Sequence, residues 1–157
     1  MLIDASTSAA RSGSALASTP SGDRLARRNL FDFFAHEVLA DLPPRLQDFM
    51  LSCSVLPELN PGLCNAVTAG DDAQQLLEEL YRRNLFLTVL DEEDLTLRLH
   101  DLFREFLGAE LARQKPDQVA ELHMRAARAE VIPNRIVMHW LKAQCWDDAL
   151  AEMMLCA

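Results

Sequence analysis

The sequence has few of the residues and runs that mark enzymes or membrane proteins. Its 157 residues include only five glycines, which frame neither a phosphate-binding loop nor a dinucleotide fingerprint, and no G-x-S-x-G motif is present. No apolar run approaches the roughly 18 residues that span a bilayer. The N-terminus lacks the continuous hydrophobic region of a secretory signal. We therefore expect no catalytic residues, no enzymatic activity, no membrane partner and a cytoplasmic location.

Cysteine and histidine are too few and too scattered for a metal site. Cys53 and Cys64 fall on apolar helical stripes, which predicts small, reduced core residues. None of the four cysteines forms a C-x-x-C pair, and no histidine lies at zinc-finger spacing from them. Three histidines lie on separate expected helices, where we expect structural or surface roles: His36, His123 and His139.

Positive charge is scarce outside the N-terminus. The net charge is −9, but residues 1–28 hold four arginines against two aspartates, so the remainder carries −11. Nucleic-acid affinity depends largely on Lys and Arg, so an acidic body disfavours a phosphate backbone. The helix expected at residues 71–84 has four acidic residues against two arginines. We predict no DNA-binding residues.

Apolar spacing predicts a mainly helical chain after a polar leader. Residues 1–28 are rich in Ser, Ala and Thr without apolar periodicity, and we expect a disordered leader. From Leu30, apolar residues at helical spacing predict a helix that Pro43 stops. A second helix opens at Pro44. A third begins at the Asn60–Pro61 cap and is closed by Gly70, and a fourth is capped by Asp71 or Asp72.

A β-hairpin that runs into a helix follows these helices. Leu95, Leu97 and Leu99 alternate with polar residues, which is the period of a half-buried strand, and Leu85–Leu90 is the expected partner. The four acidic residues Asp91–Asp94 form the expected turn. Asp101 is the expected N-cap of a helix from Leu102 to about Arg113. This order predicts a winged-helix domain over residues 29–114.

Helical spacing returns in residues 115–157. Proline restarts the chain twice, and the last expected helix carries Trp146, Leu150 and Met153 on one stripe. Nothing after it covers this apolar face, which is typical of one unit of a repeat protein. We therefore expect a helical connector and a first repeat hairpin that is truncated, as in a fragment.

Several phrases resemble one family. LADLPP, LCNAVTAG, NLFLTVLD and LHDLFREFL are similar to the middle of the large ATP-binding LuxR-type transcriptional regulators of the maltose-regulon activator type. The resemblance covers roughly residues 30–156. It implies that residues 30–113 are the winged-helix arm of a signal-transduction ATPase, a STAND protein. Residues 116–156 would begin its tetratricopeptide-like superhelix, although the linker at 130–134 is shorter than the family's usual turn.

The phrase Leu99-His100-Asp101 resembles the Met-His-Asp motif of related nucleotide-binding switch proteins. Strand parity places His100 on the polar side of the hairpin, where the residues alone favour a junction histidine bonded to a nearby carbonyl over a functional one. The resemblance implies that His100 is a nucleotide-sensing contact and that Asp101 orients it. ATP or ADP is implied for a full-length family member. No cofactor is expected in this chain, because the Walker motifs are absent.

The sequence favours a non-catalytic regulatory module that passes an inducer signal to a nucleotide-binding domain outside this chain. Its expected partners are the nucleotide-binding and helical-repeat domains of a parent protein, with self-association as a further option. One alternative is a stand-alone winged-helix DNA-binding protein, which would need a basic face. The other is an orphan or truncated protein-interaction module.

Overall fold

The computed structural model describes residues 20–157, which divide into two compact units after Asp41. The described part of the first unit is one helix, α2 (Pro20–Ala40), with an ion pair between Asp23 and Arg27 at 2.8 Å. This helix begins ten residues before the expected start at Leu30. Disorder is therefore the wrong prediction for residues 20–28, because a first-turn proline and an i, i+4 ion pair support a helix despite weak apolar periodicity. Residues 1–19 of the expected leader lie outside the described residues.

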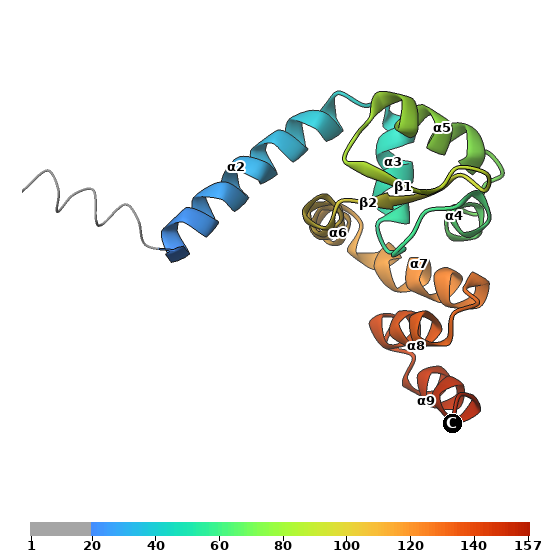
Figure 1. Ribbon diagram of the computed structural model, residues 1–157. Helices are drawn as coiled ribbons and strands as arrows, with labels where there is room; N and C mark the ends of the chain where they lie inside the picture. Colours follow the sequence, from blue (N-terminus) through green and yellow to red (C-terminus); the bar gives the residue numbers. More distant parts are fainter. Residues whose placement is uncertain (1–19) are drawn as a thin grey trace, which may run out of the picture. The chain divides into compact units, whose positions relative to one another are not determined.

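The second unit is mainly helical and contains one antiparallel hairpin, which confirms the expected winged-helix class followed by further helices (Figure 1). Proline opens four of its helices, where the missing N–H removes no helical hydrogen bond. The elements in chain order are α3 (Pro44–Cys53), α4 (Pro61–Thr68), α5 (Ala73–Arg83), β1 (Leu87–Asp91), β2 (Thr96–Leu99), α6 (Asp101–Gln114), α7 (Pro116–Ala129), α8 (Pro133–Lys142) and α9 (Trp146–Leu155).

The ends of α4 agree only partly with the sequence. Asn60 is the expected N-cap, and its Oδ1 accepts a hydrogen bond from the Leu63 N–H at 2.9 Å. At the other end, the left-handed residue is Ala69, with φ 55°, and not the expected Gly70. The start of α5 is also different. Asp72 makes no side-chain cap there, and the Asn65 side chain of α4 accepts the Ala73 N–H at 3.0 Å.

The left-handed Ala69 predicts a stabilising substitution. A side chain in this region costs about 1–2 kcal/mol per residue, and glycine removes that cost but adds entropy to the unfolded chain. Ala69→Gly should therefore raise the free energy of unfolding by about 0.5–1 kcal/mol, measured by urea denaturation. The control Ala66→Gly, at an exposed position inside the same helix, should lower it by about 1 kcal/mol. If both variants change the free energy of unfolding in the same direction, the left-handed conformation of Ala69 is contradicted.

The hairpin has a different register from the expected one. Leu87 pairs with Leu99 and Val89 with Leu97, but a bulge then brings Asp91 opposite Thr96. Asp91 ends β1, and its Oδ1 accepts the N–H groups of Glu93 and Asp94 at 2.8 and 3.2 Å. The expected turn at Asp91–Asp94 is therefore shifted by one residue to 92–95. Leu95, expected in the strand, lies in the turn with φ 50°.

The hairpin is joined to the helices by a third extended segment. Leu59 and Leu97 exchange two backbone hydrogen bonds of 2.7 and 2.8 Å, which makes Leu59 a one-residue extension of the two-stranded sheet. The buried core beneath it draws on α3, α5, β2 and α6. Its largest side chains are Leu46, Phe49, Met50, Leu77, Leu80, Leu97, Leu99, Phe103, Leu107 and Leu111.

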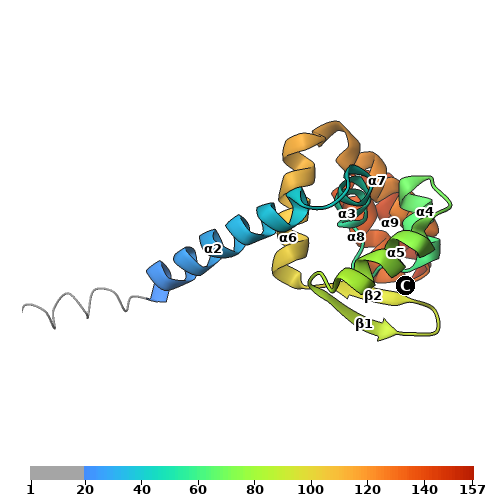
Figure 2. The same cartoon turned by 90° about the horizontal axis from the view of Figure 1, so that it is seen from above.

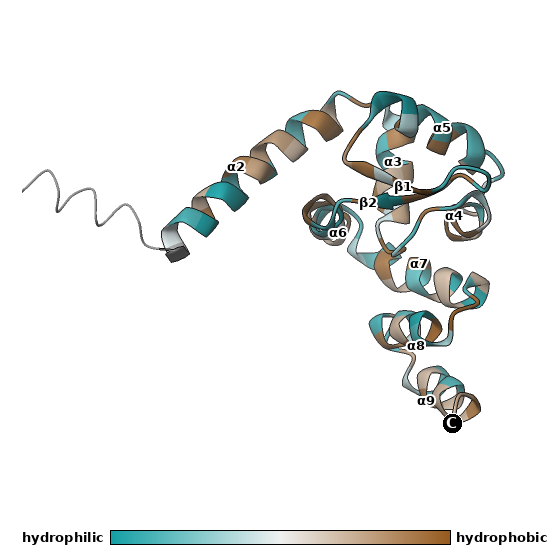
Figure 3. Cartoon of the chain, viewed as in Figure 1, coloured by the Kyte–Doolittle hydropathy of each residue, from teal (hydrophilic) through white to brown (hydrophobic). Residues whose placement is uncertain are grey.

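Helices α7, α8 and α9 follow one another in a row away from the hairpin, and Figure 2 shows them stacked behind α3 and α4 in the view from above. The last helix leaves much of its apolar surface in solvent, since Trp146, Leu150 and Met154 are all exposed. In Figure 3 α9 carries hydrophobic segments beside hydrophilic ones. None of the helices in residues 20–157 is both long enough and apolar enough to cross a bilayer.

Candidate functional site

The sequence-predicted pair His100 and Asp101 lies where β2 meets α6. His100 is exposed and lies outside the leucine core, as its strand parity predicts. Its backbone joins two elements, because its N–H donates to the Phe86 carbonyl at 2.8 Å and its own carbonyl accepts the Arg104 N–H at 2.9 Å. The backbone of His100 is therefore fixed, while its imidazole is on the surface.

Phe86 is the residue that holds this junction from the side of β1. Its backbone is in the left-handed region with φ 50°, which is a strained conformation for a bulky side chain. The Phe86 ring lies 5.0 Å from the Phe103 ring, centroid to centroid, and the Phe103 ring stacks with Phe106 at 6.1 Å. Aromatic packing of this kind compensates backbone strain. No sequence pattern points to Phe86, because the strain depends on the strand pairing.

Asp101 is not the N-cap that the sequence predicts. His100 occupies the N-cap position and Asp101 is the first helical residue, because the strand hydrogen bond keeps His100 extended. The Asp101 carboxylate forms an exposed ion pair with Arg98, 3.3 Å away on β2. Asp101 thus links β2 to the first turn of α6.

The junction gathers one exposed imidazole and one ion pair at the start of α6. The exposed imidazole of His100 stands at the start of α6, where the helix dipole favours an anion. The Asp101 carboxylate lies at the same helix end and would repel a phosphate, unless Arg98 remains paired with it. The described residues at this helix end are thus His100, Asp101 and the Arg98 that pairs with Asp101.

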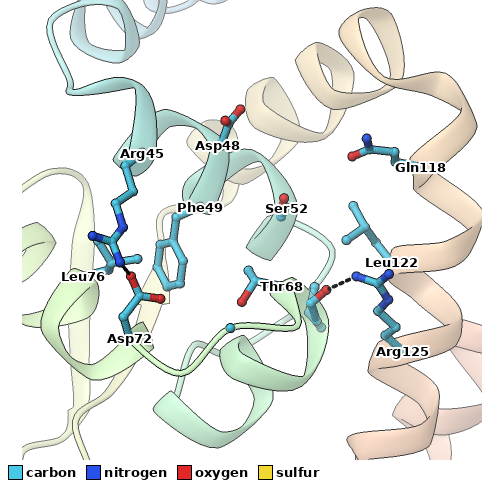
Figure 4. Close-up of a pocket in the computed structure, with 12 residues that line it drawn as sticks. Arg45, Asp48, Phe49, Ser52, Thr68, Asp72, Leu76, Gln118, Leu122 and Arg125 are labelled. Carbon is cyan, nitrogen blue, oxygen red and sulfur yellow. Dashed lines mark hydrogen bonds and ion pairs between the residues drawn. The ribbon is translucent and has the colours of Figure 1, made fainter.

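A separate hollow of about 270 Å³ lies between α3, α4 and α7 (Figure 4). Its charged groups are engaged with protein atoms. Arg45 pairs with Asp72, and Arg125 donates to the Val67 carbonyl at 3.1 Å and to Glu121 at 3.0 Å. The hydrogen bond of Arg125 therefore links α7 to α4, and the side chains that line the hollow do not form a catalytic arrangement.

The helix that a DNA-binding winged helix would place in a groove is α5, and its charges are mixed. Arg83 pairs with Glu79 at 2.7 Å, and Arg82 donates to the Glu78 carbonyl at 3.4 Å. The exposed acidic residues of the hairpin turn lie on the adjacent wing. The carboxylates of α5 and of the hairpin turn would repel the phosphate backbone of a nucleic acid. Absence of direct nucleic-acid binding stays a prediction.

The structure brings together two histidines that the sequence places apart. His123 of α7 and His139 of α8 are both buried, and their Nδ1 atoms are 3.0 Å apart. Burial is the main cause that lowers the pKa of each to about 4. Both rings are thus buried, not on the surface, and neutral at pH 7. In the described residues no group of three or more His, Cys, Asp or Glu side chains could hold a metal ion.

The cysteines of the core behave as the sequence predicts. Cys53 and Cys64 are both buried and unoxidised, and burial raises the pKa of the Cys53 thiol well above its usual range, with a hydrogen bond to Cys64 as a second cause. Such thiols are inert core residues.

Three helices, an antiparallel hairpin and a helix that starts at its end define a winged-helix protein. Comparison with known families agrees, because the MalT winged helix domain family matches residues 35–119. The chain belongs to this family.

Curated relatives extend the similarity beyond the winged helix. The HTH-type transcriptional regulator MalT of Vibrio cholerae is 33% identical over 127 residues, which cover 81% of this chain and 13% of that protein. The Vibrio campbellii regulator of the same name is 34% identical over 122 residues, 76% of this chain and 14% of that protein. The one from Yersinia pestis is 37% identical over 110 residues, 68% and 12%. The chain thus spans about an eighth of the length of these relatives.

Proposed function

We propose that this chain acts as a non-catalytic regulatory module of a MalT-like, LuxR-type transcriptional activator in the cytoplasm. In this role the hairpin and the start of α6 contact a nucleotide-binding domain of the STAND ATPase type, and α7–α9 lead into a tetratricopeptide-like helical-repeat domain. Family membership and the names of the relatives support the regulatory role. The exposed His100 on its fixed backbone is the observation that carries the contact.

The contact would be a latch, by which we mean a contact of His100 that forms only in the resting arrangement and stabilises it. His100 would touch a phosphate of ADP held by the partner domain, and Asp101, paired with Arg98, would keep the first turn of α6 in register with β2. The module would then stabilise the resting arrangement, and signal from the repeat domain would shift the population away from it. The apolar face of α9 would be covered by the following helices of the repeat domain.

The test is a chimera in which this chain replaces its matched segment in the Vibrio cholerae regulator. His100→Ala should raise inducer-independent reporter transcription several-fold, because loss of a contact worth about 1 kcal/mol in the resting state shifts that equilibrium about fivefold. The matched control is His36→Ala, an exposed histidine of α2, which should leave basal transcription unchanged. Unchanged basal activity in His100→Ala, at equal protein level, would reject the latch.

A further inference from the structure

The contact between His123 and His139 connects two helices in succession. His123 belongs to α7, which packs on α4 of the winged-helix part, and His139 belongs to α8, which pairs with α9. The rings are 5.2 Å apart between centroids and tilted by 39°. Their hydrogen bond is thus a direct polar link between α7 and α8.

Two neutral imidazoles share one hydrogen bond only when their tautomers differ. One Nδ1 must carry a proton and the other must accept it. The Nε2 atom of His139 is buried and has no hydrogen-bond partner within the described part of the chain. If His139 carries its proton on Nδ1, its buried Nε2 has only a lone pair. If His139 carries its proton on Nε2, that buried N–H has no acceptor among the described residues. The geometry therefore favours His139 as the donor and His123 as the acceptor.

A second proton disrupts this arrangement. If His123 Nδ1 becomes protonated, it faces the N–H of His139. The tautomer change that would relieve the clash moves a proton to the buried Nε2 of His139. Water can reach His123, because this residue borders a hollow of about 290 Å³.

The charges around the pair also oppose protonation. Arg104 and Glu105 of α6 and Lys142 of α8 line the same hollow, and Arg135 of α8 acts on His139. Helix α4 has no charged residue, and the other lining residues that precede it, Ser54 and Val55, are uncharged. On α9, Asp147 and Asp148 are exposed. Lys142, Arg135 and Arg104 disfavour an imidazolium at His139 after burial does, and Arg135 is itself paired with Glu58 and lies 3.9 Å from Glu130.

We propose that the His123–His139 contact is a proton-sensitive joint. It holds the α8–α9 hairpin on α7 while both rings are neutral, and uptake of a proton releases the hairpin. The joint would let mild acidification loosen the connection between the winged-helix part and the helices that follow it. It does not depend on the proposed role of His100, and its test uses the chain alone.

The sign and the pH window follow from linkage. A histidine with a pKa of about 4 when packed and 6.5 when released favours the packed state fully only above pH 6.5, and release becomes easier as pH falls from 6.5 to 4. For two rings, the equilibrium constant for opening should rise roughly 15-fold between pH 7.5 and 6. It should rise by several hundred-fold at pH 5.

Hydrogen exchange of the full chain, read by mass spectrometry and corrected for the intrinsic rate at each pH, measures this opening. Peptides from α8 and α9 should show the 15-fold rise between pH 7.5 and 6, while peptides from β1 and β2 should change less than twofold. An α8 opening constant that stays within twofold over this range would overturn the proposal.

The matched variant is His123→Asn with His139→Asn, because an asparagine amide can occupy the place of Nδ1 and hydrogen-bond without titrating. This double variant should lose the pH response of α8 and α9, and the control His36→Asn should keep it. A double variant that retains the response would overturn the proposal. If it does not fold, the wild-type imidazole proton resonances decide. The resonances of His123 and His139 should not titrate above about pH 5, and titration of both near pH 6.5 in the folded chain would overturn the joint.

Discussion

Replacing Phe103 with alanine is expected to lower the free energy of unfolding by about 3–5 kcal/mol, the usual cost of removing a buried aromatic ring. The Phe103 side chain is 0% exposed. It contacts the Phe86 ring on one side and stacks with Phe106 on the other. The deletion therefore leaves a cavity and also removes the support of the strained Phe86 backbone.

Leu102→Ala is the matched control, because Leu102 precedes Phe103 on α6 but is 42% exposed. This variant should change the free energy of unfolding by no more than about 0.5 kcal/mol. Urea denaturation followed by far-UV circular dichroism measures both. A loss below about 1 kcal/mol for Phe103→Ala would mean that the junction is held by its backbone hydrogen bonds and not by the ring.

This prediction also bears on the candidate site. The His100 N–H is bonded to the Phe86 carbonyl, so a Phe86 that loses its aromatic partner can leave its left-handed conformation. In the chimera, the proposed contact of His100 would then be weakened in a partly folded Phe103→Ala variant. Basal transcription should rise even though His100 itself is not substituted. Comparison at equal protein level separates this effect from simple degradation.

The sequence predicted those features of the fold that depend on local chemistry. Proline at the first helical turn places the starts of α3, α4 and α7, and Asn60 caps α4 as expected, since each effect involves neighbours in sequence. The leucine alternation likewise gives β2 the correct buried face, with Leu97 and Leu99 inward.

The features that were missed depend on contacts between distant residues or on competition between neighbours. The turn is shifted because the Asp91 side chain binds the next backbone N–H groups, and alternation of leucines cannot reveal that. Asp101 lost the N-cap position because His100 was already fixed by a strand hydrogen bond. The pairing of His123 and His139, sixteen residues apart, requires the antiparallel packing of two helices.

Within the candidate site, the sequence predicts that His100 and Asp101 lie at the junction between strand and helix. It does not predict which residues hold that junction in place. Phe86 was part of an expected strand, and only the structure shows its positive φ and its ring contact. Arg98 is one of the polar residues that alternate with the strand leucines, and its ion pair with Asp101 crosses from that strand to a helix. Such contacts appear in a sequence only as charges at suitable spacing.

Arg135→Met is expected to weaken the attachment of α8 by about 2–3 kcal/mol, because it leaves a nearly buried carboxylate without a countercharge. Arg135 binds both oxygens of Glu58, at 2.8 and 3.1 Å, across 77 residues of sequence. Its Nη1 also lies 3.9 Å from Glu130, whose side chain is 2% exposed. One Glu130 oxygen accepts the Val131 N–H, and the other has no hydrogen-bond partner in residues 20–157.

Two further variants separate the contributions of the two carboxylates. Glu58→Gln removes the partly exposed ion pair but leaves Arg135 beside Glu130, so it should cost no more than about 1 kcal/mol. Glu130→Gln combined with Arg135→Met should recover part of the loss, because a neutral amide needs no countercharge. Equal losses in Arg135→Met and in that double variant would show that Glu130 is already stabilised by its backbone contacts.

The chain's two tryptophans, Trp140 on α8 and Trp146 on α9, make fluorescence in urea the direct readout of this attachment. The pH dependence distinguishes it from the histidine joint. The Arg135 hydrogen bond lowers the pKa of Glu58 from 4.5, so the ion pair is intact above pH 4.5 and is lost only as pH falls through the lowered value. The histidine contribution is lost between pH 6.5 and 4. The urea midpoint of the wild-type chain should therefore fall between pH 7 and 5. If the midpoint of Arg135→Met falls by the same amount, the fall is caused by His123 and His139. If Arg135→Met abolished that fall, the arginine would be part of the proton-sensitive joint.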